Sequence, residues 1–118
     1  MSDAGFWMAL DKLVKESEIV IDRPKGSAHP RYTDSIYPLD YGYIKDTTSM
    51  DGGGIDVWRG SKAEAEVSGI VCTIDLLKRD SEIKVLIGCT EEEKNMIKCV
   101  HNETEFMKRM LITRPKQV

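Results

Sequence analysis

The chain has few cysteines, and they are widely spaced. Cys72, Cys89 and Cys99 are odd in number, which excludes a fully paired disulfide framework, and no C-x-x-C pair offers a metal knuckle. Such cysteines favour an interpretation as small buried hydrophobic side chains in a reducing compartment. No apolar signal core is present near the N-terminus, where Asp3 precedes any basic residue. We therefore expect a cytoplasmic protein.

Long apolar runs and an excess of basic charge are also missing. The longest apolar runs have the length of a strand, which is too short to span a bilayer. The 17 Lys and Arg are outnumbered by 20 Asp and Glu, and the net charge is −3. Neither nucleic acids nor anionic membranes attract such a surface, so we expect neither as a partner. Two Phe and two Trp also leave little for an OB-type module to stack on bases.

The remaining composition is that of an ordinary globular protein. With 118 residues, 41% of them hydrophobic and 31% charged, the chain has the size and balance of one soluble domain, residues 1–118. No internal repeat and no interdomain linker interrupt it.

Periodicity predicts helices near both ends. Apolar residues at helical spacing indicate an amphipathic N-terminal helix; they are Phe6, Trp7, Leu10, Leu13 and Val14. Thr90 and Glu93 have the capping-box spacing and predict a helix that continues to about Val100. Asn102 is expected to cap a last helix. That helix would contain Phe106, Met107, Met110 and Leu111.

The middle of the chain reads as a series of short strands. Runs of β-branched and aromatic residues predict them at Glu18 to Asp22, Tyr41 to Lys45, Ile55 to Trp58, Val67 to Leu76 and Glu82 to Ile87. Strands followed by terminal helices predict an α+β fold that is mainly β. We expect a small, closed or nearly closed barrel with flanking N- and C-terminal helices.

A glycine turn between two carboxylates is the most informative segment. Asp51 precedes Gly52, Gly53 and Gly54, and Asp56 follows at the start of a strand. Carboxylates brought together in this way suit a hard cation such as Mg²⁺, which prefers oxygen ligands. The alternative is a plain hairpin, because Asp-Gly is a common turn pair.

Other residues nearby favour a phosphate and metal site. Asp75 interrupts an apolar run, where a carboxylate is costly if it is buried without a partner. Glu82 and Lys84 share one face of a predicted strand. A tyrosine cluster, which includes Tyr41, lies just ahead of the glycine turn. Carboxylates with cationic and phenolic donors suit a phosphate chain neutralised by Mg²⁺.

Several spaced motifs carry a resemblance to a known family. Residues 37–44 resemble Y-P-x-N-Y-G-F/Y-I, and residues 51–57 resemble D-G-D-P-x-D-V. Residues 22–24 resemble E-I-P, Arg31-Tyr32 resembles K-Y, and Glu82-Ile83-Lys84 resembles D-x-K. In this order the motifs resemble those of the soluble Mg²⁺-dependent (family I) inorganic pyrophosphatases, whose fold is a small OB-like β-barrel.

The resemblance implies a role for each matching residue. Asp51, Asp56 and Asp75 would be shared metal ligands, Glu82 would serve a further metal, and Asp22 would lie in its outer shell. Arg31, Tyr41 and Lys84 would bind phosphate, with Asp56, Lys84 and Tyr41 central to catalysis. The implied cofactor is Mg²⁺, or Mn²⁺, and the implied substrate is inorganic diphosphate or a related phosphoanhydride. A metal-activated water would attack one phosphorus, and a homo-oligomer would be expected.

Departures from the family pattern leave two hypotheses open. Gly53 stands where the family has a carboxylate that contacts metal and accepts a proton, and a lost general base typically costs about 10²–10⁴ in rate. The short 33–35 connection replaces a hairpin that brings a phosphate-binding Arg, and Lys108 and Arg109 are the only substitutes for a C-terminal Tyr-Lys pair. Asp80 competes with Glu82 as a ligand. The chain is either a shortened diphosphatase or a weak or inactive homologue that binds divalent metal and a phosphate-containing ligand.

Overall fold

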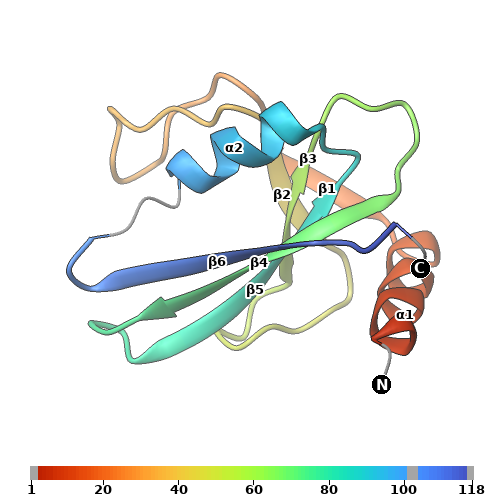
Figure 1. Ribbon diagram of the computed structural model, residues 1–118. Coiled ribbons are helices and arrows are strands. Elements are labelled where there is room, and N and C mark those ends of the chain that lie inside the picture. Colours follow the sequence, from red (N-terminus) through yellow and green to blue (C-terminus); the bar gives the residue numbers. More distant parts are fainter. Residues whose placement is uncertain (1–2, 101–103, 117–118) are drawn as a thin grey trace.

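The computed structural model describes residues 3–100 and 104–116 and consists of one sheet with two helices beside it (Figure 1). In chain order the elements are α1 (Ala4–Lys15), β1 (Ile19–Arg23), β2 (Asp40–Ile44), β3 (Ile55–Arg59), β4 (Val67–Asp75), β5 (Asp80–Ile87), α2 (Glu91–Val100) and β6 (Met107–Thr113). The predicted α+β class, mainly β, is confirmed.

The sheet is open. Its strand order is β1-β2-β3-β5-β4-β6, in which only β3 and β5 pair in parallel. A closed barrel needs its two edge strands to pair with each other, and among the described residues β1 and β6 do not. In Figure 1 the long strands β4, β5 and β6 form one layer, and β1, β2 and β3 run behind it in another direction. The predicted closed barrel was therefore wrong.

The predicted last helix was also wrong, because Met107 to Thr113 form β6. This strand pairs antiparallel with β4, from Gly69 opposite Thr113 to Asp75 opposite Met107. The apolar residues of such a short run fit both the helical and the strand period, and pairing with the free edge of β4 satisfies the backbone as a strand. Asn102, the predicted cap, lies outside the described residues. The second helix is thus α2, between β5 and β6.

The predicted N-terminal helix and the capping box of α2 are both confirmed. Trp7 and Val14 of α1 are buried, although Phe6 is half exposed. At α2 the Thr90 hydroxyl accepts from the Glu93 N–H at 3.1 Å, and the Glu93 carboxylate accepts from the Thr90 N–H at 2.9 Å. Each side chain therefore satisfies a backbone donor that a helix start leaves unpaired.

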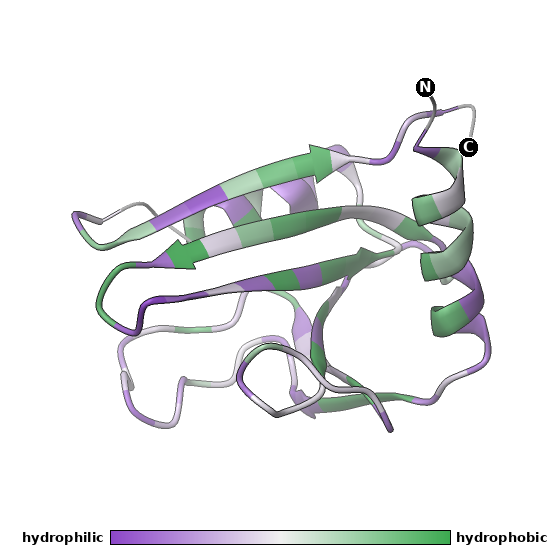
Figure 2. Cartoon of the chain, turned by 90° about the horizontal axis from the view of Figure 1, so that it is seen from below, coloured by the Kyte–Doolittle hydropathy of each residue, from purple (hydrophilic) through white to green (hydrophobic). Residues whose placement is uncertain are grey.

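Each face of the sheet has its own apolar core. Trp7 and Val14 of α1 pack with Val57 and Val85, and Ile97 of α2 packs in the other cluster, with Trp58 and Leu86. Neighbouring strand residues thus point to opposite faces, and Figure 2 shows hydrophobic and hydrophilic residues alternating along β5. In the part of the chain that the structure describes, no helix is long and apolar enough to cross a membrane.

Candidate functional site

Strand register aligns polar side chains on the sheet face that α2 covers. Tyr41 lies opposite Trp58, and Trp58 lies beside Leu86 of β5. Paired residues share a face, as do residues two apart on one strand. Asp56, two residues before Trp58, and Lys84, two before Leu86, therefore face the same side as Tyr41. The predicted shared face of Glu82 and Lys84 on β5 extends this row.

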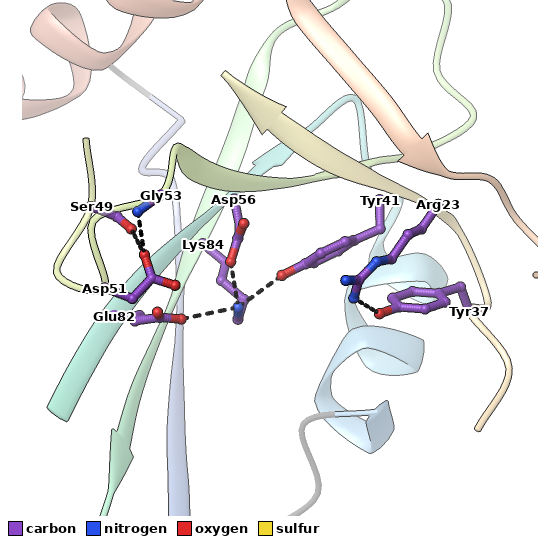
Figure 3. A network of polar contacts seen from close by, with 9 residues as sticks. All are labelled: Arg23, Tyr37, Tyr41, Ser49, Asp51, Gly53, Asp56, Glu82 and Lys84. Carbon is purple, nitrogen blue, oxygen red and sulfur yellow. Dashed lines mark hydrogen bonds and ion pairs between the residues drawn. The ribbon is translucent and has the colours of Figure 1, made fainter. Parts of the chain in front are cut away.

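The Lys84 ammonium is the centre of the site (Figure 3). Its Nζ donates to the Tyr41 hydroxyl at 2.9 Å, to Asp56 Oδ2 at 2.9 Å and to Glu82 Oε2 at 3.3 Å. Lys84 is buried, and its Nζ lies 5.4 Å from the centroid of the Tyr41 ring. A buried ammonium needs such partners, because burial without them would drive it to lose its proton.

These contacts determine the protonation of both Lys84 and Tyr41. Burial alone lowers the pKa of Lys84, but Tyr41 and Asp56 together raise it above its ordinary value. Burial raises the pKa of Tyr41, and the charge of Asp56 adds to that increase, against an opposing effect from Lys84. At neutral pH Lys84 is therefore charged, and Tyr41 keeps its phenolic proton.

The glycine turn positions the Asp51 carboxylate. Asp51 Oδ1 accepts from the Ser49 hydroxyl at 2.7 Å and from the Gly53 N–H at 2.9 Å. Gly52 has a φ of 85°, which favours glycine at that position. The hydrogen bonds from Ser49 and Gly53 lower the pKa of Asp51 to about 2. The segment is both the connection of the β2–β3 hairpin and the holder of a charged carboxylate, so the two sequence interpretations are compatible.

Asp51 and Glu82 bring two carboxyl groups together. Figure 3 shows their side chains next to each other, and each carboxyl group affects the pKa of the other. Burial raises the pKa of Glu82, and Asp51 raises it further, against an opposing effect from Lys84. Two neighbouring carboxyl groups repel when both are charged, so this pair attracts either a shared proton or a cation.

The carboxyl pair fits a metal that is also bound by phosphate oxygens of a ligand better than it fits a metal bound by protein side chains alone. Within residues 3–100 and 104–116, no three His, Cys, Asp or Glu side chains are grouped to hold a metal ion. The Lys84 ammonium lies between Asp56 and Glu82, where a third carboxylate ligand would have to approach. Mg²⁺ is commonly bound by one or two carboxylates together with phosphate oxygens and waters. The Asp51–Glu82 pair fits that donor set.

The structure does not bring the remaining predicted residues into this network. Asp75 Oδ1 accepts from the N–H groups of Leu77 and Lys78 at 2.9 and 3.0 Å, which stabilises the β4–β5 turn. It lies opposite Asp80, at the end of the hairpin. Asp22 and Arg31 are exposed, and the backbone N–H of Arg31 donates to His29. Of the two alternatives on β5, Glu82 rather than Asp80 contacts Lys84.

Sequence reasoning missed Arg23 as a member of the site. Its Nη1 donates to the Tyr37 hydroxyl at 2.5 Å, and the Tyr37 ring lies 5.3 Å from that of Tyr41. The motif comparison treated Arg23 as the middle of an E-I-P-like segment. No local signal marks the change in strand register that places it here.

A hollow lies apart from this polar network. It has a volume of about 950 Å³ and lies between α1, the 62–68 segment and the start of α2. Asp11 and Arg114 line it and form a two-pronged ion pair with distances of 2.6 and 2.7 Å. None of the residues that contact Lys84 lines this hollow, so the polar network is not part of it.

Comparison with known proteins supports the fold. The chain matches no protein-family model, and no curated protein matches it significantly. Among solved structures it resembles the inorganic pyrophosphatase of the pathogenic bacterium Helicobacter pylori, with a TM-score of 0.55 and 15% identity over 82% of each chain. The protein therefore has a pyrophosphatase-like fold.

Proposed function

We propose that the protein hydrolyses inorganic diphosphate, or a related phosphoanhydride, with Mg²⁺ or Mn²⁺. The observation that supports this is the Lys84 ammonium, held among Tyr41, Asp56 and Glu82 beside the exposed carboxylate of Asp51. Cationic and phenolic donors next to carboxylates suit a phosphate chain that is partly neutralised by metal. The pyrophosphatase-like fold supports the same reaction.

Asp51 and Glu82 would hold the metal, with Asp56 beside them. When bound, the metal would supply charge neutralisation and activation of a water. Lys84 and Tyr41 would then act on the substrate directly. The three Nζ donors of Lys84 are taken by Tyr41, Asp56 and Glu82. Once Glu82 holds the metal, the donor that Glu82 accepts goes to a phosphate oxygen, and the ammonium stabilises negative charge on the leaving phosphate. Tyr41 keeps its proton and donates a second hydrogen bond, and Asp56 orients the ammonium.

The second candidate is a weak or inactive homologue that binds divalent metal and a phosphate-containing ligand. Gly53 favours it, because no side chain at this position can accept the proton of an attacking water. The position of Lys84 also favours it, because an ammonium between Asp56 and Glu82 competes with a metal for the same carboxylates.

Phosphate release from diphosphate tests both candidates. Purified wild-type protein is assayed with Mg²⁺ and with Mn²⁺, beside Asp56→Asn, Gly53→Asp and the control Glu92→Gln, an exposed carboxylate on α2. A Cβ at Gly53 would meet only the Asp51 side chain, at 3.4 Å, so the backbone position accepts a side chain. We expect metal-dependent release that Asp56→Asn reduces by at least about a hundredfold. The control should leave it unchanged, and Gly53→Asp should raise it by up to about 10²–10⁴-fold.

Other outcomes separate the two candidates. Activity only in Gly53→Asp would mean a site that lacks its base, which is the second candidate. Silence in every variant, with metal binding retained, would reject hydrolysis.

We also propose a reducing compartment, the cytoplasm. All three cysteines, at positions 72, 89 and 99, are free in the structure. An oxidising compartment would favour their pairing or modification.

A further inference from the structure

The register of β1 turns Arg23 toward the candidate site. Ile21 lies opposite Gly42 and Arg23 lies opposite Tyr41, so β1 advances by two residues where β2 advances by one. The extra residue, Asp22, is a β-bulge, and a bulge changes the face to which the following side chain points. Without it, Arg23 would share the face of Ile21. With it, Arg23 shares the face of Tyr41.

Two contacts with Tyr37 hold the guanidinium of Arg23. Its Nη1 donates to the Tyr37 hydroxyl at 2.5 Å, and its Cζ lies 5.7 Å from the centroid of the Tyr37 ring. Tyr37 itself is buried and packs against Trp58 with 5.8 Å between ring centroids. The guanidinium therefore has a defined position beside the core and does not extend freely into solvent.

Among the described residues the Arg23 guanidinium forms no close ion pair, and Asp22, its exposed neighbour in the chain, acts on it only through its charge. In the described part of the chain no Asp or Glu forms an ion pair with it, whereas Lys84 has two such partners. The hydroxyl of Tyr37 occupies one of the five N–H donors of the guanidinium. Arg23 therefore has both net positive charge and donors available for an anion.

The network has an acidic end and a basic end. In Figure 3 Asp51 and Glu82 lie at one end, Lys84 and Tyr41 in the middle, and Arg23 with Tyr37 at the other. A phosphate group that shares a metal with carboxylates is held at the acidic end. A planar guanidinium at the basic end suits the oxygens of a second phosphate group bonded to the first.

We propose that Arg23 binds the second phosphate group of a diphosphate and that Tyr37 is its positioning residue. This rests on the proposed function, which it deepens.

Binding and turnover are measured in parallel on the full chain. The probes are diphosphate with Mg²⁺, for KM and kcat, and imidodiphosphate with Mg²⁺, for calorimetric affinity without hydrolysis. The variants are Arg23→Gln, Arg23→Lys and Tyr37→Phe. Arg79→Gln, an exposed cation in the β4–β5 turn, is the matched control. Thermal unfolding identifies any variant that fails to fold, and Arg23→Lys retains the charge if Arg23→Gln does not fold.

We expect Arg23→Gln to weaken imidodiphosphate binding and raise KM by about 10–100-fold, the range for loss of a charged hydrogen bond. Arg23→Lys should lie between wild type and Arg23→Gln, because an ammonium cannot bind two oxygens as a fork. Tyr37→Phe should raise KM severalfold with little change in kcat, a split that mere destabilisation would not produce. Arg79→Gln should bind as wild type does.

Failure of the inference and failure of the proposed function give different results. Wild-type hydrolysis with an Arg23→Gln variant of unchanged KM and affinity would overturn the inference and leave the function. Binding that depends on Arg23, without hydrolysis, would leave the inference and reject the reaction. Absence of both binding and hydrolysis in the wild type would overturn both.

Discussion

At the scale of single residues, the three cysteines differ in environment. Cys89 is 2% exposed, and its Sγ lies 3.7 Å from the carbonyl oxygen of Ile87. Cys72 is half-buried and Cys99 is exposed on α2, so the prediction of three buried cysteines was wrong for Cys99. Burial, helped by the charge of Glu93, raises the pKa of Cys89 to about 11. Reactivity needs the thiolate, so Cys89 is the least reactive of the three.

Alkylation with iodoacetamide at pH 8, followed by peptide mass spectrometry, tests this order. We expect Cys99 to react first and Cys89 only after unfolding in urea. Because the thiol form is favoured in the folded state, the stability that it contributes is complete below pH 9. It is lost as the pH rises through 11. Labelling of Cys89 in the folded protein at the rate of Cys99 would contradict its burial.

Single residues also decide which predicted ligands are available. Asp75 was predicted as a metal ligand because a carboxylate in an apolar run is unfavourable when it has no partner. In the structure, two backbone N–H groups of its own turn are its partners. Asp51 also accepts from its own turn, but its carboxyl group still reaches Glu82. The turns that hold Asp75 and Asp51 lie at different places relative to the sheet. No local sequence pattern indicates where a turn will lie.

At the scale of elements, the start of α2 is held by a reciprocal cap that also connects another segment. Besides the Thr90 N–H, the Glu93 carboxylate accepts from the Ser61 N–H at 3.1 Å. The cap thus connects α2 to the chain that leaves β3.

Thr90→Ala should lower the free energy of unfolding by about 1 kcal/mol, because the Glu93 N–H loses its acceptor. Thr48→Ala, at an exposed threonine in the β2–β3 connection, is the control and should cost much less. Urea unfolding followed by circular dichroism measures both. Equal losses in the two variants would show that the cap does not stabilise α2.

At the scale of the whole molecule, one sheet face retains exposed apolar side chains. Ile83 of β5, Ile74 of β4 and Met110 of β6 are 44%, 49% and 58% exposed. Register places Ile83 and Met110 on the same face, on either side of Cys72. β6 is also an edge strand, whose outer backbone groups are open to pairing.

We therefore expect two copies of the chain to associate through this face, in line with the homo-oligomer that the sequence resemblance implies. A single chain has a Cα radius of gyration of 13.9 Å. Small-angle scattering should give a larger value that falls on dilution, and Met110→Lys should restore the single-chain value. Met96→Lys, an exposed methionine on α2, is the control and should not. A single-chain value for the wild type at every concentration would reject association.

Local patterns were sufficient for most elements. Five predicted strands, α1 and the start of α2 are found within about a residue or two of their predicted ends. Each depends on periodicity or capping, which neighbouring residues determine. The shared face of Glu82 and Lys84 follows for the same reason, since strand side chains alternate.

The sequence by itself thus determined most of the elements, the α+β class and the shared face of Glu82 and Lys84. Only the tertiary structure decided that the sheet stays open, that residues 107–113 add to β4 as a strand, and that a bulge turns Arg23 toward Tyr41. These features depend on which strands pair and in what register. Such pairing joins residues far apart in the chain, and a shift of one residue reverses the face of every side chain that follows.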